Sequence, residues 1–385
     1  MKVGVVAGEA SGDVIGALMI RALKARWPEL EFVGIAGPKM QAAGATSWYP
    51  MEKLAVRGYL EVLKSLRELL SMRAELGRRM IEARPALFVG IDAPDFNLKL
   101  ERRLKQAGIP SVHYVSPSIW AWRGERIHSI RESVDHMLTV FPFEPAIYAQ
   151  AGVPATFVGH PTADQIPQKD QREEARAQLR LKPSDLVFAL LPGSRQSELD
   201  YHAELFLETA KRLHAAFPHA KFLVPLTTRE TREQFEAAKW KCGAQDLPLQ
   251  VLFGHANFAL AAADAALIAS GTATLEAAML RCPHVIAYRL SNATYRLMKR
   301  KAYLPWVGLP NILANAWLVP ELLQHEATPD NLARALGNWV RHPDAAKTLR
   351  ERFDAIHASL AVDNAARVCE ALAPYIERPA GARAA

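Results

Sequence analysis

Short apolar runs alternate with amphipathic stretches along almost the whole chain, and this pattern restricts the fold most. Runs that are apolar at nearly every position are typical of parallel strands buried on both faces, and the stretches between them predict covering helices. We therefore expect an α/β fold with doubly wound parallel sheets. The runs place strands at residues 3–7, 32–35, 87–91, 112–115, 137–140, 186–191, 221–225, 249–252, 265–269 and 284–287.

The length of 385 residues exceeds what one hydrophobic core usually supports, so two domains are expected. The polar segment 165–183 contains two prolines and many charges, and the strand pattern restarts after it. We expect Rossmann-like domains at 1–165 and 184–344 that face a cleft. The end of the chain is predicted to be helical, with 345–376 packed back on the first domain and 377–385 forming a flexible tail.

The cysteine content, the apolar stretches and the net charge indicate where the protein is located and what kind of partner it binds. The three cysteines are far apart and lack metal-ligand spacing, which indicates a reduced, cytosolic protein without structural zinc. No signal peptide is visible, and the longest apolar stretch, 258–269, is too short to cross a bilayer. The net charge of +7 favours an anionic partner such as a nucleotide, a phospholipid surface or RNA.

A turn of small residues, Ser270-Gly271-Thr272, follows the predicted strand 265–269 and opens a helix. Free backbone N–H groups at a helix start favour phosphate binding. Glu276 lies one turn further on, where a carboxylate about 6 Å from a phosphate would cost roughly 3 kcal/mol. We therefore expect it to bind ribose hydroxyls. The alternative is a simple capped helix with a favourably placed glutamate.

Ser194 and Arg195 follow the first strand of the second domain, after a Pro-Gly turn. A guanidinium at a strand end can bind a diphosphate bidentately and stabilise a departing nucleotide. Alternatively, Arg195 only forms an ion pair with Glu198.

Two acids follow the predicted strand 87–91. Asp95 comes directly after Pro94 and is predicted to cap the next helix. Asp92 is left at the strand end, where it suits a general base that removes a proton from an acceptor hydroxyl. Its alternative role is a hydrogen bond within the local turn.

Two further loops follow strands of the first domain. Residues 8–13, with Glu9 and Ser11, lack the spacing of a dinucleotide-binding loop, and either contact an acceptor or phosphate or form a plain turn. Trp120 can stack on a sugar, although packing in the core or an interface is the favoured interpretation. No Asp-x-Asp pair or other carboxylate cluster suited to a divalent metal is present, so sugar transfer would not need a metal ion.

A basic amphipathic segment precedes the Asp92 strand. Leucines recur at helical spacing among arginines and lysines, a pattern that suits contact with an anionic bilayer. An ordinary helix packed on the sheet is the alternative. The predicted membrane-contacting residues are Leu60, Leu63, Leu66, Arg67 and Leu70.

Taken together, these motifs resemble those of the lipid-A-disaccharide synthase family. The resemblance extends from Val3 to about Leu372 and rests on residues 7–13, 90–97, 113–123, 158–160, 190–195, 269–276 and 309–311. It implies the two-domain GT-B glycosyltransferase fold, with acceptor and lipid bound by the first domain and UDP by the second. It also implies that no metal is used and that the enzyme is peripheral on the cytoplasmic face of the inner membrane.

The reaction implied by the resemblance joins a UDP-linked diacylglucosamine to a diacylglucosamine 1-phosphate. It is inverting, forms a β-1,6-linked disaccharide and releases UDP. At the matching positions Asp92 is the catalytic acid and Arg195 the essential arginine, while Asn311 is a cleft asparagine. Ser11, Ser270, Thr272 and Glu276 fall in binding loops. An exchanged-domain dimer is compatible with the family, but the sequence favours no oligomeric state.

Two other functions remain to be separated from this one. A UDP-sugar 2-epimerase of the same fold also uses small-residue loops at a diphosphate, but the basic amphipathic segment and the tryptophans argue against it. A nucleic-acid adaptor would explain the positive charge, yet no RNA- or DNA-binding motif is present, and the strand-end loops would be unexplained.

Overall fold

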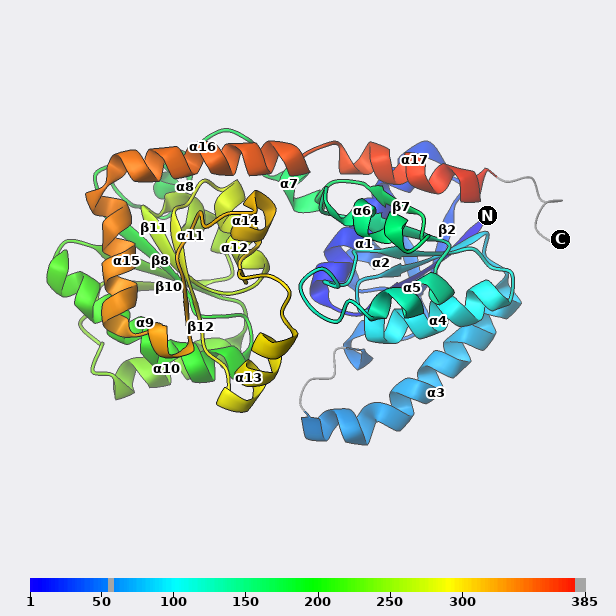
Figure 1. Ribbon diagram of the computed structural model, residues 1–385, viewed down its shortest axis with the longest axis horizontal. Helices are drawn as coiled ribbons and strands as arrows, with labels where there is room; N and C mark the ends of the chain where they lie inside the picture. The colour runs from blue at the N-terminus through cyan, green and yellow to red at the C-terminus, as the bar shows by residue number, and fades with distance from the viewer. Residues whose placement is uncertain (55–58, 378–385) are drawn as a thin grey trace. The chain divides into compact units, whose positions relative to one another are not determined.

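The computed structural model describes residues 1–54 and 59–377, with side chains described for 1–54 and 67–377. It divides into two compact units (Figure 1). Unit 1 comprises Met1–Asp164 and the segment that starts at Leu360, and unit 2 comprises Gln165–Ser359. No helix in the described part of the chain is long and apolar enough to cross a bilayer.

Unit 1 contains a parallel sheet whose seven described strands have the order β3-β2-β1-β4-β5-β6-β7. Its strands are β1 (Lys2–Ala7), β2 (Glu31–Ile35), β3 (Ala45–Ser47), β4 (Leu87–Ile91), β5 (Ser111–Tyr114), β6 (His136–Thr139) and β7 (Ala155–Phe157). Its helices are α1 (Ala10–Arg26), α2 (Pro38–Ala42), α3 (Tyr59–Ala83), α4 (Pro94–Gln106), α5 (Arg126–Ser133), α6 (Glu144–Gln150), α7 (Pro161–Gln165, at the unit boundary) and α17 (Asn364–Ile376), with a 3-10 turn at Met51–Lys53.

Unit 2 repeats this topology with six described strands in the order β10-β9-β8-β11-β12-β13, again all parallel. Its strands are β8 (Val187–Leu191), β9 (Lys221–Leu226), β10 (Leu249–Phe253), β11 (Ala265–Ala269), β12 (His284–Tyr288) and β13 (Glu321–Leu323). Its helices are α8 (Arg172–Gln178), α9 (Gln196–Ala216), α10 (Arg229–Lys241), α11 (Ala256–Ala262), α12 (Thr272–Met279), α13 (Asn292–Lys301), α14 (Leu309–Ala314), α15 (Pro329–Arg341) and α16 (Pro343–Leu360), with a 3-10 turn at Gln324–Glu326.

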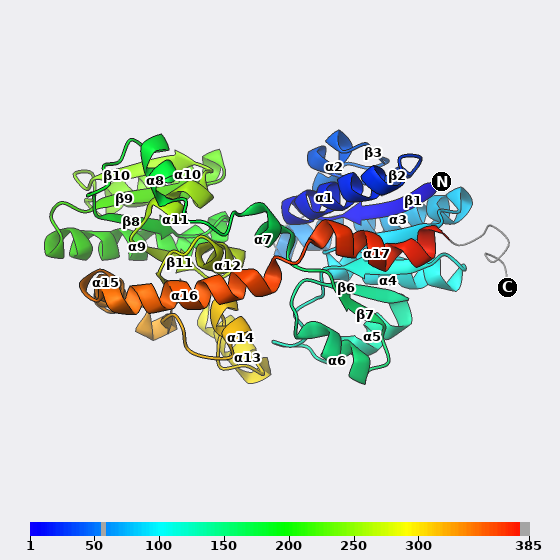
Figure 2. The same ribbon diagram turned by 90° about the horizontal axis from the view of Figure 1, so that it is seen from above.

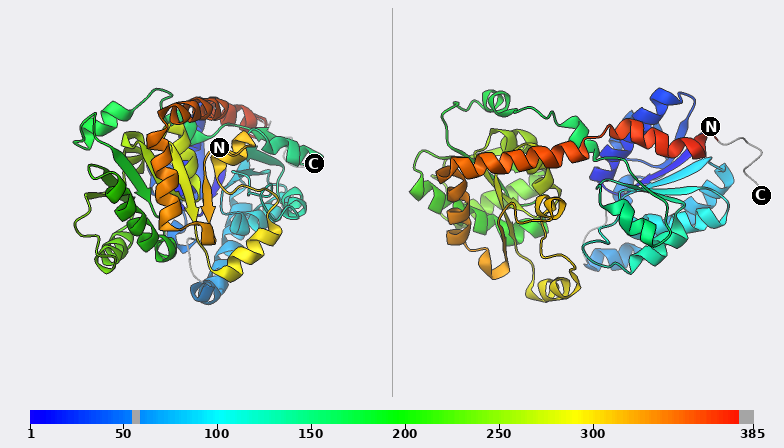
Figure 3. Two further views of the ribbon diagram at one scale, coloured as in Figure 1. Left: turned by 60° about the vertical axis from the view of Figure 1, so that its left-hand side comes forward. Right: turned by 45° about the horizontal axis from the view of Figure 1, so that its top comes forward.

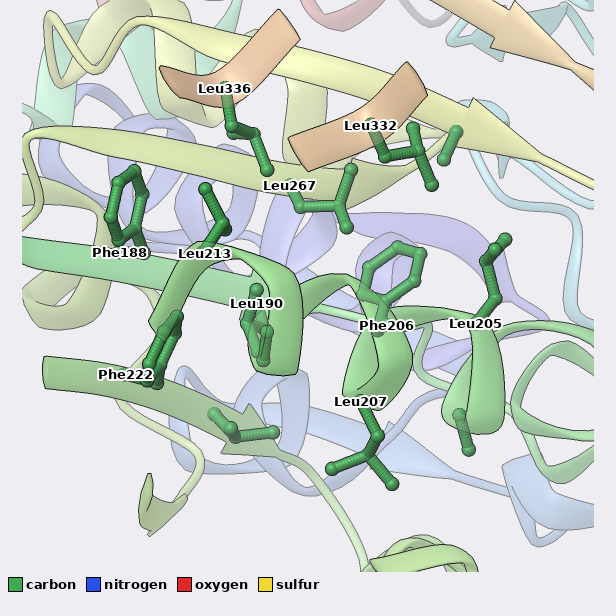
Figure 4. Close-up of a cluster of buried hydrophobic side chains, with 14 of the residues drawn as sticks. Phe188, Leu190, Leu205, Phe206, Leu207, Leu213, Phe222, Leu267, Leu332 and Leu336 are labelled. Atoms are coloured by element: carbon green, nitrogen blue, oxygen red, sulfur yellow. The ribbon is translucent and has the colours of Figure 1, made fainter. Parts of the chain in front are cut away.

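The central strands are apolar because helices cover both faces of each sheet. β4, β8 and β11 are buried at every position. In unit 2, Phe188, Leu190 and Leu267 on strands pack with residues of α9 and α15 such as Phe206 and Leu336 (Figure 4). Fully burying each such side chain contributes about 1.5–3 kcal/mol, so the strand ends and the loops that follow them are held firmly.

The predicted start of the second domain at residue 184 is wrong, because unit 2 begins at Gln165. The polar segment 165–183 contains α8, which packs on α11. Arg176 is buried there, where its guanidinium forms an ion pair with Asp264 at 3.0 Å and donates to the Ala262 carbonyl at 3.0 Å. The charges of this segment therefore attach it to unit 2.

The predicted packing of all of 345–376 on the first domain is also wrong. α16 belongs to unit 2 up to Ser359, and only α17 belongs to unit 1, where it packs on α1 (Figure 2). The helix breaks at Asp363, which has a left-handed backbone (φ 58°) and caps α17 through the Ala366 N–H. The predicted tail, apart from Glu377, lies outside the described residues.

Candidate functional site

The predicted site loops lie at the topological switch point of each sheet. In unit 1 the neighbouring strands β1 and β4 lead to helices on either side of the reversal, and in unit 2 β8 and β11 do the same. Ligands of doubly wound folds bind beyond the carboxyl ends of such strands. Each unit therefore presents one pair of adjacent loops suited to ligand binding.

In unit 1 the loop after β1 lies against the loop after β4. The strands pair Ala7 with Ile91, and a Cβ added to Gly8 would come within 2.6 Å of the Ala93 Cβ. Only glycine allows this close approach. Glu9, at the start of α1, and the exposed Ser11 are thus brought to the same end of the sheet as Asp92.

Asp92 has a left-handed backbone with φ 52°, and Ala93 follows with φ 45°. Non-glycine residues in this region cost of order 1–3 kcal/mol each and concentrate at functional sites. The conformation is held by the buried Asn97, whose amide donates to the Asp92 carbonyl at 2.8 Å, and by the Asp92 N–H, which donates to the Tyr114 carbonyl at 2.9 Å. Among the described residues no donor contacts the Asp92 carboxylate, so the predicted turn hydrogen bond is not formed.

The predicted capping role of Asp95 is wrong. The N-cap of α4 is Ala93, and Asp95 lies in the first turn, where it forms an ion pair with Arg126. Pro94 takes the first helical position, where its missing N–H is not needed, so the cap lies at Ala93, two residues before Asp95. Asp13, in the first turn of α1, accepts hydrogen bonds from the Lys39 and Met40 N–H groups at the start of α2, each at 2.9 Å.

In unit 2 the turn after β11 has the geometry expected of an anion site. Gly271 is the N-cap of α12 with φ 134°, a conformation that favours glycine, and no side chain caps the helix. Ser270 is partly buried and Thr272 is exposed, beside the open helix start. The N–H groups of the first turn are thus directed outward at the positive end of the helix dipole.

Ser194 and Arg195 lie beside this turn, because β8 and β11 pair Leu191 with Ile268. Glu198, in the first turn of α9, holds their loop by accepting from the Ser194 N–H at 2.8 Å and the Arg195 N–H at 3.2 Å. Its carboxylate is also 3.7 Å from the Arg195 guanidinium, so the predicted alternative ion pair is present. The Arg195 side chain is nevertheless half exposed.

Glu276 lies on the first turns of α12 and is partly buried. Burial raises the pKa of its carboxyl above the ordinary glutamate value, because the charged form is desolvated. No described residue donates a hydrogen bond to the Glu276 carboxylate. A ligand that supplied hydroxyl donors would therefore stabilise the ionised form.

The predicted cleft role of Asn311 is wrong. Asn311 is fully buried, and its amide donates to the Val319 carbonyl at 2.9 Å and to Glu321 at 2.8 Å. Its oxygen accepts from the Leu318 and Val319 N–H groups. With all four hydrogen bonds made within the protein, the side chain fixes the loop before β13 and has no capacity left for a ligand.

Trp120 packs against other side chains of unit 1, as the favoured interpretation of the sequence predicted, and is not an open surface for stacking on a sugar. Its indole N–H donates to Glu144 at 3.0 Å, and its ring makes edge contacts with Phe141 and Phe143. Burial raises the pKa of Glu144 to about 7.

The basic amphipathic segment forms part of α3. Leu70 and Arg67 are exposed on it. The side chains of Leu60, Leu63 and Leu66 lie outside the described residues. Two residues of the predicted lipid-contacting face are thus exposed. Contact of this face with lipid stays a prediction.

The loop-holding roles of two residues were missed from the sequence. Asn97 and Glu198 each hold a functional loop through backbone groups, which spacing alone does not reveal. The only signal for Asn97 is a polar residue between Phe96 and Leu98, and a buried polar residue requires hydrogen-bond partners.

Comparison with known proteins identifies close relatives. A family model described as lipid-A-disaccharide synthetase matches residues 3–369. A lipid-A-disaccharide synthase of Aromatoleum aromaticum is 54% identical over 98% of this chain and 96% of its own length. One from Pseudomonas aeruginosa is 49% identical over 98% of this chain and 99% of its own length.

Solved structures share the fold at low sequence identity. The UDP-GlcNAc 2-epimerase from Neisseria meningitidis, bound to UDP-GlcNAc, aligns with a TM-score of 0.66 at 11% identity, covering 98% of this chain and all (100%) of that one. WaaG, a glycosyltransferase involved in lipopolysaccharide biosynthesis, aligns with a TM-score of 0.54 at 12% identity, covering 97% of this chain and 99% of that one. The predicted doubly wound, GT-B-like architecture is confirmed.

Proposed function

The chain belongs to the lipid-A-disaccharide synthase family, and we propose that it catalyses the transfer for which that family is named. It is a glycosyltransferase. The donor is UDP-2,3-diacylglucosamine and the acceptor is 2,3-diacylglucosamine 1-phosphate. The products are the β-1,6-linked disaccharide 1-phosphate and UDP. The observation that carries the proposal is Asp92, an acid without a hydrogen-bond donor that is held at a switch point by a strained backbone.

The donor is bound by unit 2. The N–H groups at the start of α12 and the Arg195 guanidinium bind the diphosphate, with Ser194, Ser270 and Thr272 beside it. Glu276 accepts hydrogen bonds from the ribose hydroxyls, which compensates for the desolvation that raises its pKa.

The chemical step is a single displacement with inversion. The acceptor hydroxyl oxygen attacks the anomeric carbon of the donor while the bond from that carbon to the UDP oxygen breaks. Asp92 takes the hydroxyl proton, and Arg195 stabilises the negative charge that develops on UDP. In this proposal a guanidinium and a helix start supply the positive charge at the diphosphate, and no metal ion takes part. Ser11 and Glu9 contact the acceptor.

The epimerase alternative is not favoured. Relatives with about half of their residues identical are named as synthases, whereas the epimerase likeness is one of fold at 11% identity. Incubation with UDP-acetylglucosamine alone separates the two reactions. The transferase leaves this nucleotide sugar unchanged, and formation of its 2-epimer without an acceptor would contradict the proposal.

Both substrates are acylated, so we also propose that the protein acts while bound peripherally to the cytoplasmic face of the inner membrane. The exposed Leu70 and Arg67 on α3 suit contact with anionic phospholipid. Replacing Leu63, Leu66 and Leu70 by Ser should reduce sedimentation with phosphatidylglycerol-containing vesicles. Unchanged sedimentation would instead support the alternative that α3 is an ordinary helix packed on the sheet.

A further inference from the structure

A long stretch of unit 2 carries no acidic residue. Between Glu276 and Glu321 the sequence contains neither aspartate nor glutamate, yet it contains Arg281, Arg289, Arg296, Lys299, Arg300 and Lys301. Four of these basic residues fall within six positions of α13. The surface around α13 therefore has a strong local positive charge.

α13 is attached to unit 2 in an unusual way, because none of its residues is buried. Its start is capped by Ser291, whose hydroxyl accepts from the Thr294 N–H at 3.2 Å. Figure 3 shows the helix at the periphery of unit 2, apart from the sheet. Packing in the core thus does not explain the apolar residues that the helix carries.

The helix is amphipathic with a cationic face. Arg296, Lys299 and Arg300 follow the spacing of one helix face. Leu297 and Met298 lie on the other side, with Lys301 between them, and are 56% and 43% exposed. No acidic side chain among the described residues pairs with the four basic residues of α13, which leaves them to attract an external anion.

Exposed aromatic residues follow α13 along the chain. Tyr303 is 58% exposed, and Trp317 is 61% exposed with its ring against Trp306 at 6.3 Å between centroids. Tryptophan and tyrosine are the side chains enriched at the level of lipid head groups. We call α13, Tyr303 and Trp317 the α13 surface.

We propose that the α13 surface binds an anionic phospholipid bilayer, so that unit 2 has a membrane contact of its own. Leu297, Met298 and Trp317 would enter the interface, and the basic residues would attract the phosphate groups of the lipids. This inference rests on the proposed function, in which both substrates carry acyl chains and are presented by a membrane.

Other anionic or apolar partners fit the surface less well. A nucleic acid would use the basic residues, but it offers no apolar region for exposed leucine and methionine. A second copy of the chain would cover the apolar residues, but a two-fold contact would bring two acid-free basic surfaces together. A bilayer with anionic head groups can both pair with the basic side chains and take up the exposed apolar side chains.

The test uses the full chain and vesicles of phosphatidylglycerol with phosphatidylethanolamine, compared with vesicles of phosphatidylcholine. One variant carries Leu297→Ser, Met298→Ser and Trp317→Ser, and a second carries Lys299→Gln, Arg300→Gln and Lys301→Gln. Each should bind the anionic vesicles at least tenfold more weakly than the wild type. The charge variant should also lose most of its dependence on salt.

The matched control carries Trp240→Ser and Phe253→Ser, since these residues of unit 2 are 72% and 63% exposed but lie outside the α13 surface. It should bind like the wild type. Because all these side chains are exposed, the unfolding midpoint should change little in any variant. Vesicle binding by both α13 variants at the wild-type level would overturn the inference, as would a dimer in vesicle-free solution that the α13 variants abolish.

Transferase activity in detergent separates this inference from the proposed function. The α13 variants should keep wild-type turnover on detergent-dispersed substrates and lose it on substrates embedded in vesicles. A wild type without turnover in detergent would contradict the proposed function, whereas an active wild type with unaffected α13 variants on vesicles would contradict the inference alone.

Discussion

At the scale of single residues, Asp92 is set apart by its backbone. Two successive left-handed residues are kept in place by Asn97, whose amide also lies 3.3 Å from the Val6 carbonyl on the neighbouring strand. The hydrogen bonds that offset the strain involve the main chain of Asp92 and leave its carboxylate available. A side chain placed in this way suits proton transfer better than structural support.

Replacing Asp92 with Asn keeps the size of the side chain and removes the base. We expect kcat to fall by about 10²–10⁴-fold, while the affinity for the nucleotide sugar stays near the wild-type value. Initial rates and calorimetric titration measure the two quantities. Asp95→Asn is the matched control, because that acid is paired with Arg126, and it should keep most activity. An Asp92→Asn enzyme that retains most turnover would exclude Asp92 as the base.

Arg195 is expected to act through its two-pronged guanidinium. Arg195→Lys keeps the charge but loses bidentate binding, so kcat should fall by about 10²–10³-fold. Arg229→Lys is a suitable control, since Arg229 also forms an ion pair with a helix glutamate, at 2.7 Å from Glu233, but lies outside the predicted loops. Equal rates for the two variants would remove Arg195 from the chemical step.

Glu276 should make donor binding depend on pH. Its raised pKa means that the carboxyl protonates at a higher pH than an ordinary glutamate as pH falls, and the protonated form accepts ribose hydroxyls less well. The affinity for UDP-acetylglucosamine, which has no phosphate that titrates in this range, should therefore decrease on acidification. Glu276→Gln should bind more weakly, by about 10–100-fold, and without this dependence. Parallel pH profiles for the two proteins would contradict the assignment.

At the scale of elements, unit 2 has a built-in sensitivity to acid where β12 meets α16. His284 is fully buried, its ring stacks on Phe353 at 5.5 Å, and its Nδ1 donates to the Cys282 carbonyl at 2.9 Å. Burial lowers the pKa of His284 to about 4, because the charged ring would be desolvated.

The unfolded chain takes up the proton near pH 6.5 and the folded chain only near pH 4, so acid favours unfolding between these values. The contribution of His284 is fully present above about pH 6.5, and about 3 kcal/mol is lost as pH falls towards 4. Denaturant unfolding at several pH values should show a smaller loss for His284→Leu than for the wild type. The loss should not vanish in His284→Leu, because burial also lowers the pKa of His160 in unit 1 to about 4, and His160 contributes to the pH dependence of both proteins. Identical pH slopes would contradict this account.

The elements that the sequence did not predict are short and lie at sheet edges. β3, β7 and β13 each have three residues and are edge strands. Three residues are too few to show an apolar pattern, so only pairing with the neighbouring strand defines them. The ten strands that were predicted have longer apolar runs, and the structure places each within about two residues of its expected bounds.

The position of a residue relative to a strand end could be predicted from the sequence. Asp92, Arg195 and the turn at Gly271 lie in the loops after central strands, as expected, and their roles stay predictions. Asn311 could not be placed in this way. Its environment depends on Glu321, ten residues later, whose carboxylate accepts from the Val307 and Gly308 N–H groups as well. Long-range contacts of this kind are not encoded in local spacing.

At the scale of the whole molecule, two sheets of the same strand order divide the work of the proposed reaction. Unit 1 supplies the base and unit 2 supplies the nucleotide-binding turn, and the chain returns to unit 1 through α17. Membership of the lipid-A-disaccharide synthase family supports a UDP-sugar donor, and the acylated substrates stay part of the proposed function.

The most direct test of this account measures UDP release from UDP-2,3-diacylglucosamine with and without 2,3-diacylglucosamine 1-phosphate, in detergent and with a metal chelator. The account predicts release that requires the acceptor, produces UDP and disaccharide in equal amounts, and is unaffected by the chelator. Release that is independent of the acceptor, that yields no disaccharide, or that stops when the chelator is added would contradict it.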